Sequence, residues 1–372
     1  CARAQASGRV GIDTEFVRDR TYYPKLALVQ LAVDDEISLV DPLMGIDLAV
    51  LHELLSDPTV VKVFHAAGQD LELFWYQMGE PVNAVFDTQI GAALIGLGNQ
   101  VGYSNLVKEM LGHDLGKGPQ YTDWLQRPLS EKQLAYAADD VRYLFQIQDG
   151  LNARLAELDR FDAAQEEMQP LSDPVRYTLT AEDLLGKVKG SGGLKSAERA
   201  IMLRLAVWRE EEAQKRDIPR RRVVGDETLT TIARGKPKNE SGLERCRGLH
   251  AGEIRRSGRL LLSMVAEGIR DPSPPPPARS RPSTASEAMS DLVRIVVKQL
   301  CHDLHISPGA LAKGSDLDSL VSDWNSDRDL SDHPLMSGWR GDLIGKELAA
   351  LFEGQTTVGV DPKTGKLRLT RR

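Results

Sequence analysis

Five side chains in three separate segments have the types and spacing that divalent cations require. Asp13 and Glu15 are two residues apart in a segment that alternates as a strand does, so both carboxylates point to one face. Asp70 follows a second strand-like run and falls in the first turn of an expected helix, where the helix dipole stabilises a carboxylate. Tyr136 and Asp140 are four residues apart and share one face of a later helix, with small alanines between them.

Each segment alone has a purely structural explanation. An edge strand with its acids in water accounts for Asp13 and Glu15, a helix often begins with an acid, and Tyr136 could be a core aromatic. Asp139 is rotated by about 100° from Asp140 and is therefore left outside the site. Taken together, these hard oxygen ligands favour Mg²⁺ or Mn²⁺ over zinc. Two such ions, about 3.5–4 Å apart, serve in-line displacement at phosphorus, so the combination predicts phosphoryl chemistry.

The elements that must position these residues predict a mixed α/β domain. Three strand-like runs with short connections indicate an antiparallel meander, and a helix, a strand and a second helix follow. Their expected bounds are 10–16, 26–33 and 36–40 for the meander, then 47–55, 60–64 and 68–78. From 87 to 160 the pattern is mostly helical. Strands followed by strand–helix alternation are typical of a mixed sheet flanked by helices.

The remainder of the chain is expected to be helical and divided by a linker. The glycine-rich stretch 190–193 marks a joint, and the Pro/Ser-rich stretch from Asp271 predicts an extended spacer. A small hairpin is expected over 355–370. The expected domains are 1–165 (α/β), 166–194 (connector), 195–270 (first helical domain), 271–287 (linker) and 288–372 (C-terminal helical domain).

The charge is distributed unevenly along a chain of otherwise globular composition. Of 372 residues, 41% are hydrophobic and 27% are charged. The sequence contains no run of eighteen apolar residues, so it predicts no membrane span. The net charge of −7 divides into 16 basic against 29 acidic residues over 1–194, 17 against 10 over 195–259, and 14 against 15 over 260–372. Such asymmetry indicates nucleic-acid contact by the basic part. Arg220, Arg221 and Arg222 are the expected phosphate contacts there, with a solvated charged face as the alternative.

The three cysteines are too few and too scattered for a disulfide framework or a cysteine-rich zinc site. This usage fits a reducing compartment, so we expect a cytoplasmic protein. The sequence begins at Cys1 without an initiator Met. A truncated N-terminus and a processed lipoprotein cysteine are the two explanations considered, and the first is favoured because nothing else indicates secretion.

The motifs in these segments resemble those of the ribonuclease D family, in the tyrosine branch of the DEDD superfamily of 3′→5′ exonucleases. The three exonuclease motifs correspond to 13–16, 65–71 and 136–141, and the intervening matches to 17–24, 86–90 and 122–129. Residues 195–270 resemble an HRDC domain through 205–210, 213–219 and 249–254. Residues 288–372 resemble a second, HRDC-like module through 333–335 and 338–340. The resemblance implies a ribonuclease-H-like exonuclease domain followed by one or two all-α HRDC-type domains.

The resemblance also implies a role for each site residue. Asp13 would bridge two metal ions, Glu15 and Asp140 would hold the ion that activates water, and Asp70 would support the second ion through water. Tyr136 would orient the attacking water. Lys117 is a candidate substrate contact, although a solvated loop lysine is the favoured reading and Gly118 stands where a serine is common in the family.

The sequence therefore predicts a metal-dependent 3′→5′ exoribonuclease. It would release nucleoside 5′-monophosphates and trim the 3′ ends of tRNA precursors, without a membrane or an obligate protein partner. One alternative is a 3′→5′ DNA exonuclease, since the catalytic side chains do not report a 2′-hydroxyl; no P-loop or polymerase region supports it. The other alternative is a non-catalytic RNA-binding scaffold, against which the intact carboxylates and tyrosine argue.

Overall fold

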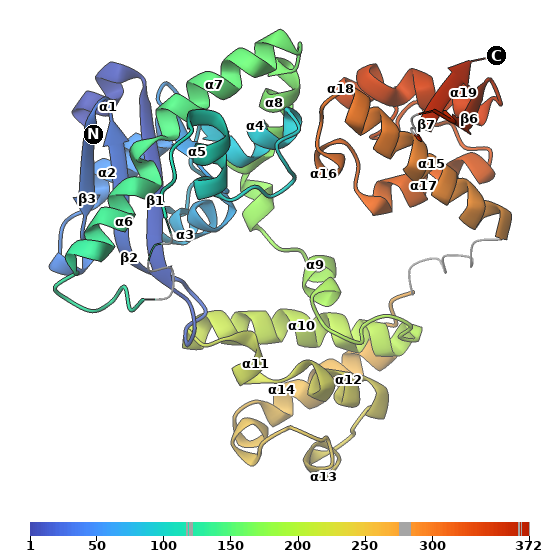
Figure 1. Ribbon diagram of the computed structural model, residues 1–372. Helices are drawn as coiled ribbons and strands as arrows, with labels where there is room; N and C mark the ends of the chain where they lie inside the picture. Colours follow the sequence, from blue (N-terminus) through green and yellow to red (C-terminus); the bar gives the residue numbers. More distant parts are fainter. Residues whose placement is uncertain (117, 119–121, 275–283, 364, 366, 372) are drawn as a thin grey trace.

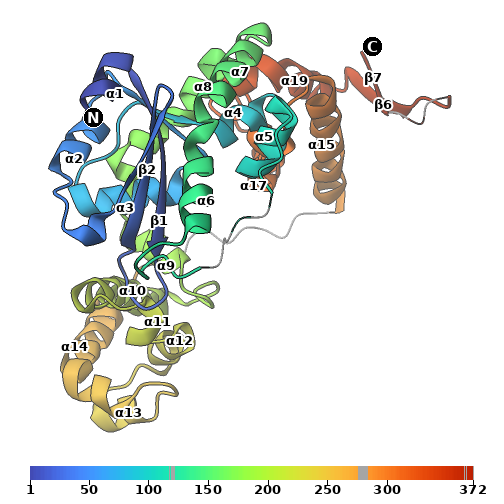
Figure 2. The ribbon, with the colours of Figure 1, turned by 60° about the vertical axis from the view of Figure 1, so that its left-hand side comes forward.

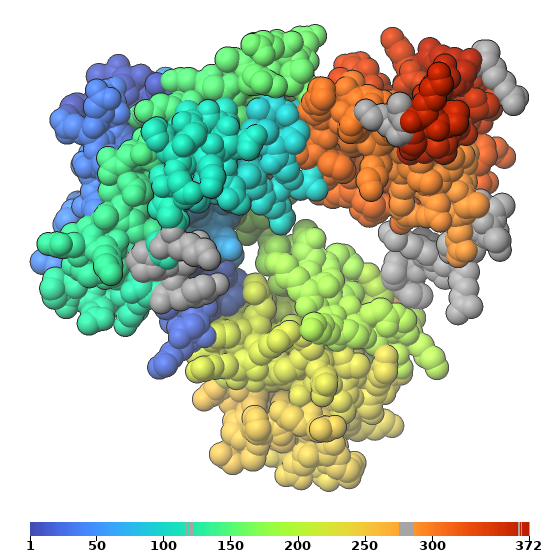
Figure 3. Space-filling view, viewed as in Figure 1, coloured from blue at the N-terminus to red at the C-terminus, as the bar shows by residue number. Residues whose placement is uncertain are grey.

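The computed structural model describes residues 1–116, 118, 122–274, 284–363, 365 and 367–371. It shows an α/β domain that carries the N-terminus, a helical domain below it and a C-terminal helical domain beside it (Figure 1). In the space-filling view, the two helical domains lie apart, and the C-terminal one adjoins the α/β domain (Figure 3). No helix in the described part of the chain combines the length and the apolar character that crossing a membrane requires.

A mixed sheet forms the centre of the α/β domain, with its five strands in the order β3-β2-β1-β4-β5. The strands are β1 (Arg9–Val17), β2 (Lys25–Val33), β3 (Glu36–Val40), β4 (Val61–Phe64) and β5 (Val85–Asp87). β1 pairs antiparallel with β2 and parallel with β4, so parallel strands extend the expected meander. β1 is the middle strand, and Asp13 and Glu15, although beyond its pairing with β4, are partly buried, so the explanation of an edge strand with its acids in water is wrong.

Helices cover both faces of this sheet (Figure 2). α6 (Glu131–Arg142) packs across β1, β2 and β3, and a capping box between Ser130 and Gln133 fixes its first turn. α3 (Gly68–Met78) follows β4 and lies on the other side of β1. The remaining helices of the domain are α1 (Ala2–Ser7), α2 (Ala49–Ser56), α4 (Thr88–Leu94), α5 (Tyr103–Leu111), α7 (Leu144–Glu157) and α8 (Phe161–Met168), with a 3₁₀ turn η1 (Pro42–Met44).

The first helical domain has a hydrophobic core of its own. The long helices α10 (Ser196–Arg216) and α14 (Ala251–Arg270) pack together and bury Leu205 and Leu261 completely. The shorter helices of this domain are α11 (Arg220–Val223), α12 (Asp226–Gly235) and α13 (Glu240–Glu244). Two 3₁₀ turns, η2 (Gln169–Ser172) and η3 (Pro174–Tyr177), and helix α9 (Ala181–Gly186) connect it to the α/β domain.

The C-terminal domain packs directly on the α/β domain and shares its hydrophobic core. It consists of α15 (Thr284–Asp303), α16 (Pro308–Leu311), α17 (Gly314–Asn325), α18 (Gly338–Arg340), the π-helical turn η4 (Gly341–Gly345), α19 (Lys346–Phe352), β6 (Thr356–Val360) and β7 (Leu367–Arg371). Polar contacts fix the contact surface: Glu167 accepts hydrogen bonds from Trp339 Nε1 (3.1 Å) and Arg340 Nη1 (2.7 Å). The strands β6 and β7 form the expected hairpin.

Two of the expected boundaries differ from the structure. α8 continues through position 165 to Met168, because no glycine or proline interrupts it before Pro170. Of the expected linker 271–287, the stretch 275–283 lies outside the described residues, and 284–287 already belongs to α15. The last four positions lack the prolines of the preceding stretch, so a helix can begin there.

The buried Arg160 adds hydrogen bonds between the α/β domain and the C-terminal domain. The Arg160 side chain, 3% exposed, donates to the carbonyl oxygens of Leu94 (2.7 Å), His305 (3.1 Å) and Leu304. We predict that Arg160→Met lowers the free energy of unfolding by about 3 kcal/mol, because buried carbonyls lose charged donors. Urea unfolding measures this loss. Arg154→Met, on exposed α7 surface, should change it by less than about 0.5 kcal/mol, and equal effects of both variants would contradict the prediction.

Candidate active site

Three carboxylates from the sheet and from α6 converge above β1. Oxygen atoms of Asp13, Glu15 and Asp140 all lie within 4.8 Å of one another, and all three residues are partly buried. Strand alternation puts the two β1 carboxylates on one face. α6 crosses that face and adds the Asp140 carboxylate. The sheet and this helix therefore bring together Asp13 and Asp140, which are 127 positions apart in the sequence.

The carboxylates repel one another and are held partly out of water. Burial, and then the charge of Asp140, raises the pKa of Glu15 to about 8. Burial, and then the charge of Asp139, raises the pKa of Asp140 to about 7. The pKa of Asp13 is raised well above its usual range by burial and by three neighbouring carboxylates. A divalent cation would replace this repulsion by attraction, and the all-oxygen donor set fits Mg²⁺ or Mn²⁺.

Asp70 approaches the cluster from the other side of β1. It is 7% exposed, accepts a hydrogen bond from the Thr14 hydroxyl, and burial raises its pKa to about 6. Its oxygens are not among the three that lie within 4.8 Å. The spacing of the acidic residues alone does not predict this hydrogen bond of Thr14. A polar residue in an otherwise apolar strand position between two acids was the available signal.

The loop before α3 is fixed by backbone hydrogen bonds, and this loop places Asp70. The Asp87 carboxylate accepts from the backbone N–H groups of Ala66 (3.0 Å) and Ala67 (2.9 Å). Ala66 has a φ of 58°, a left-handed conformation that these bonds stabilise. His65 is bound on both ring nitrogens, to Thr88 Oγ1 and to the carbonyl of Val101 (both 2.9 Å). His65 and Asp87 therefore support the loop.

Tyr136 lies one helical turn before Asp140, on the same face of α6. Its ring packs near Trp124, with 6.2 Å between ring centroids. Burial and the carboxylates raise the pKa of the phenol, so it stays protonated and can donate. A β-carbon at Gly118 would overlap the Tyr136 ring, so only glycine fits against this side of the tyrosine. Lys117 lies outside the described residues.

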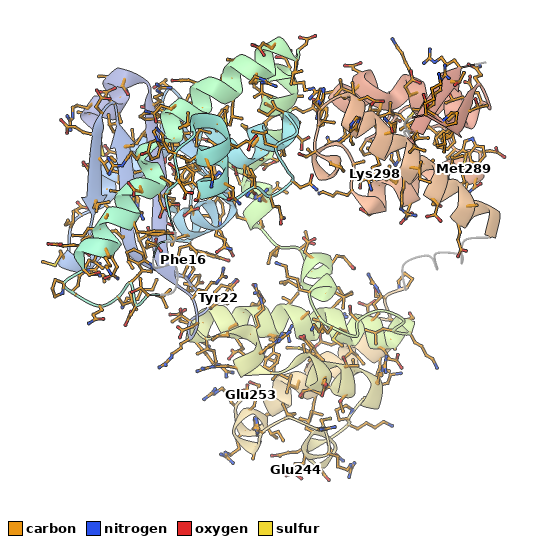
Figure 4. All side chains as sticks on the ribbon, in the orientation of Figure 1. Phe16, Tyr22, Glu244, Glu253, Met289 and Lys298 are labelled. Atoms are coloured by element: carbon orange, nitrogen blue, oxygen red, sulfur yellow. The ribbon has the colours of Figure 1, made fainter. Side chains whose placement is uncertain are left out.

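Arg220 contributes to the joint between the α/β domain and the first helical domain, which differs from its expected role as a phosphate contact. Its guanidinium binds both oxygens of Glu210 and lies over the Tyr22 ring, 5.0 Å from the centroid. The Tyr22 hydroxyl donates to the same carboxylate. Tyr22 extends from the β1–β2 loop toward α10 (Figure 4). The buried Glu210 charge attracts Arg220 more strongly than exposed acids do.

The same joint anchors the loop that directly follows β1. Asp217 at the end of α10 accepts from the backbone N–H groups of Tyr22 and Tyr23, both at 3.0 Å. The position of the first helical domain is thereby tied to β1. Arg221 has a side chain that is 70% exposed, and Arg222 is exposed as well. Of the three arginines, only these two have exposed side chains, and Arg221 lies 3.8 Å from the Asp226 carboxylate.

Comparisons with known proteins agree with this arrangement. A family model described as 3′-5′ exonuclease matches residues 1–156, and one described as HRDC domain matches 198–265. Ribonuclease D of Gluconacetobacter diazotrophicus is 40% identical over 95% of this chain and 89% of its own length, and that of Granulibacter bethesdensis is 37% identical over 100% and 94%. The crystal structure of Escherichia coli RNase D matches with a TM-score of 0.80 and 32% identity over 95% of each chain.

The fold and the acidic cluster thus define a 3′→5′ exonuclease with a mixed α/β catalytic domain and an HRDC domain. The chain belongs to the ribonuclease D family. It is a hydrolase, a 3′→5′ exoribonuclease, and the family and fold class expected from the motifs are confirmed.

The raised pKa of Glu15 makes the metal-free protein less stable as the pH rises. An unfolded glutamate ionises near pH 4.5, while folded Glu15 keeps its proton to about pH 8. Between these values the native state binds more protons, so its stability falls with increasing pH. We predict that Glu15→Gln stabilises the metal-free protein by about 3 kcal/mol at pH 8.5 and has little effect at pH 4.5.

Urea unfolding of both proteins in chelator, at the two pH values, measures this difference. Glu157→Gln is the control, because it removes an exposed carboxylate of α7 that lies outside the cluster. The prediction fails if Glu15→Gln destabilises the protein at pH 8.5, or if the control gives the same gain.

Proposed function

We propose that this exoribonuclease uses two divalent cations, Mg²⁺ or Mn²⁺, to release nucleoside 5′-monophosphates, and that it trims the 3′ ends of tRNA precursors. The observation that carries the metal dependence is the cluster of Asp13, Glu15 and Asp140, whose partly buried carboxylates lie within 4.8 Å of one another. Without cations this arrangement is electrostatically unfavourable. It is therefore better explained as a binding site than as a structural device.

Each residue has a defined task in this proposal. Asp13 would hold both ions, Glu15 and Asp140 the one near the attacking water, and Asp70 the other one through water. The bound ions would lower the pKa of water and stabilise the leaving oxygen. Tyr136 would orient the water by donating its hydroxyl proton in a hydrogen bond. The water oxygen would bond to phosphorus as the P–O3′ bond breaks. The water would lose one proton, and the leaving 3′-oxygen would take up one proton to become the new 3′-hydroxyl.

RNA is the favoured substrate because of the relatives and the charge. The curated relatives are named Ribonuclease D, and the E. coli protein is described as an exoribonuclease involved in structured RNA processing. The HRDC domain carries the basic excess of the chain. It is fixed beside the α/β domain by the hydrogen bonds of Tyr22 with Asp217 and Glu210. A structured RNA with a single-stranded 3′ tail could bind both at once. DNA and a non-catalytic scaffold are outcomes that the test below distinguishes.

We also propose a cytoplasmic location and no obligate protein partner. Cys246 and Cys301 are buried and unpaired, which suits a reducing compartment.

The test is stepwise shortening of a tRNA precursor with a 3′ tail by the full chain. With Mg²⁺ or Mn²⁺ we expect a ladder from the 3′ end and release of nucleoside 5′-monophosphates, abolished by chelator and by Asp13→Ala. A matched DNA oligomer should be shortened more slowly than RNA. Equal rates would favour the DNA exonuclease, and tight binding without cleavage in either metal would favour the scaffold.

Contact between RNA and the HRDC domain can be tested at Arg221. We predict that Arg221→Met raises KM for the tRNA precursor and lowers the slope of log affinity against log salt by about one, because one phosphate contact is lost. Its kcat on a trinucleotide should be unchanged. Arg328→Met, with a side chain that is also 70% exposed but in the C-terminal domain, is the control. An unaltered salt dependence for Arg221→Met would remove this residue from the RNA-binding surface.

A further inference from the structure

A buried glutamine in the central sheet has no hydrogen-bond partner. Gln30 on β2 is 0% exposed, and in the described part of the protein neither its amide nitrogen nor its amide oxygen is bonded. Leaving such a group unpaired away from water destabilises a protein by about 1–3 kcal/mol for each donor or acceptor. Buried polar side chains without partners are uncommon and call for an explanation.

The strand register places Gln30 directly beside the acidic cluster. It is the antiparallel partner of Asp13, and partners of this kind have side chains on the same face with β-carbons about 4.5–5.5 Å apart. Glu15 is paired with Leu28, the next residue of β2 on that face, and therefore lies diagonally from Gln30. A side chain as long as glutamine reaches a facing carboxylate over this distance.

The other surroundings of Gln30 are apolar. Its partner on β3 is Leu39. On either side along β2, Leu28 packs in one cluster with Ala137 of α6, and Ala32 packs in another with Val141. Gln30 therefore lies beneath the segment of α6 that carries Asp140. The polar groups that the strand register and α6 bring near its amide are those of the acidic cluster.

We propose that Gln30 is a positioning residue of the active site, whose Nε2 donates a hydrogen bond to the Asp13 carboxylate when that carboxylate holds a divalent cation. This inference rests on the proposed metal-dependent function. The terminal torsion of glutamine is broad, so the amide can turn toward Asp13 without movement of β2. The bond would fix the carboxylate orientation and satisfy a buried donor at the same time. Partners of this kind typically change metal affinity 10–100-fold when removed.

The test compares Mn²⁺ binding and thermal unfolding of wild-type protein, Gln30→Met and Gln148→Met. Methionine has a similar length but no polar atoms, so it should fill the buried site. Gln148 is also buried but lies on α7, where it accepts from Arg9. We expect calorimetry to show Mn²⁺ binding at least 10-fold weaker in Gln30→Met than in wild-type protein, with a metal-free Tm that is unchanged or higher. Gln148→Met should bind Mn²⁺ like wild-type protein.

The outcomes separate this inference from the function on which it rests. Equal Mn²⁺ affinity of Gln30→Met and wild-type protein would overturn the inference, and so would a lowered metal-free Tm with unchanged affinity. No Mn²⁺ binding by wild-type protein would overturn the proposed function itself. If Gln30→Met does not fold, Gln30→Asn keeps the amide but shortens its reach, and it should show the same loss of Mn²⁺ affinity.

Discussion

Electrostatic repulsion among carboxylates on one partly buried face of β1 is the constraint on which this structure depends. Asp13 and Glu15 come from one strand and Asp140 from a helix across it, and the fold holds them within 4.8 Å of one another. Burial and mutual charge raise all three pKa values. The clustered carboxylates thus lower the stability of the metal-free protein at the place where a cation can be bound, and functional sites commonly lower stability in this way.

The remainder of the α/β domain holds these groups in place. The capped helix α6 is fixed across the sheet, and Asp87 fixes the loop before α3. The Thr14 hydroxyl of β1 donates a hydrogen bond to the Asp70 carboxylate. The loop that follows β1 carries Tyr22, which is bonded to Asp217 and Glu210, so the HRDC domain is oriented by the same strand that carries the acids. The acidic cluster and the HRDC domain are therefore mechanically connected over a few residues.

Much of this could be predicted from the sequence, because local periodicity determines strands and helices and the motifs have strict spacing. The meander, α3, α6 and the final hairpin were expected, as was the family. What the sequence could not show was pairing between distant residues: the middle position of β1, the ion pair of Arg220 with Glu210, and the burial of Gln30 beneath α6 depend on tertiary contacts. A run of three arginines does not reveal which one faces a buried acid.

Electron paramagnetic resonance of Mn²⁺ titrated into the full chain at pH 8 tests the central claim most directly. If the acidic cluster exists to hold two cations, two Mn²⁺ should bind per chain and give a spin-coupled signal, as expected for ions about 3.5–4 Å apart, and Asp13→Asn should abolish the coupling. A single uncoupled Mn²⁺ per chain, or a signal that is unchanged in Asp13→Asn, would contradict the account.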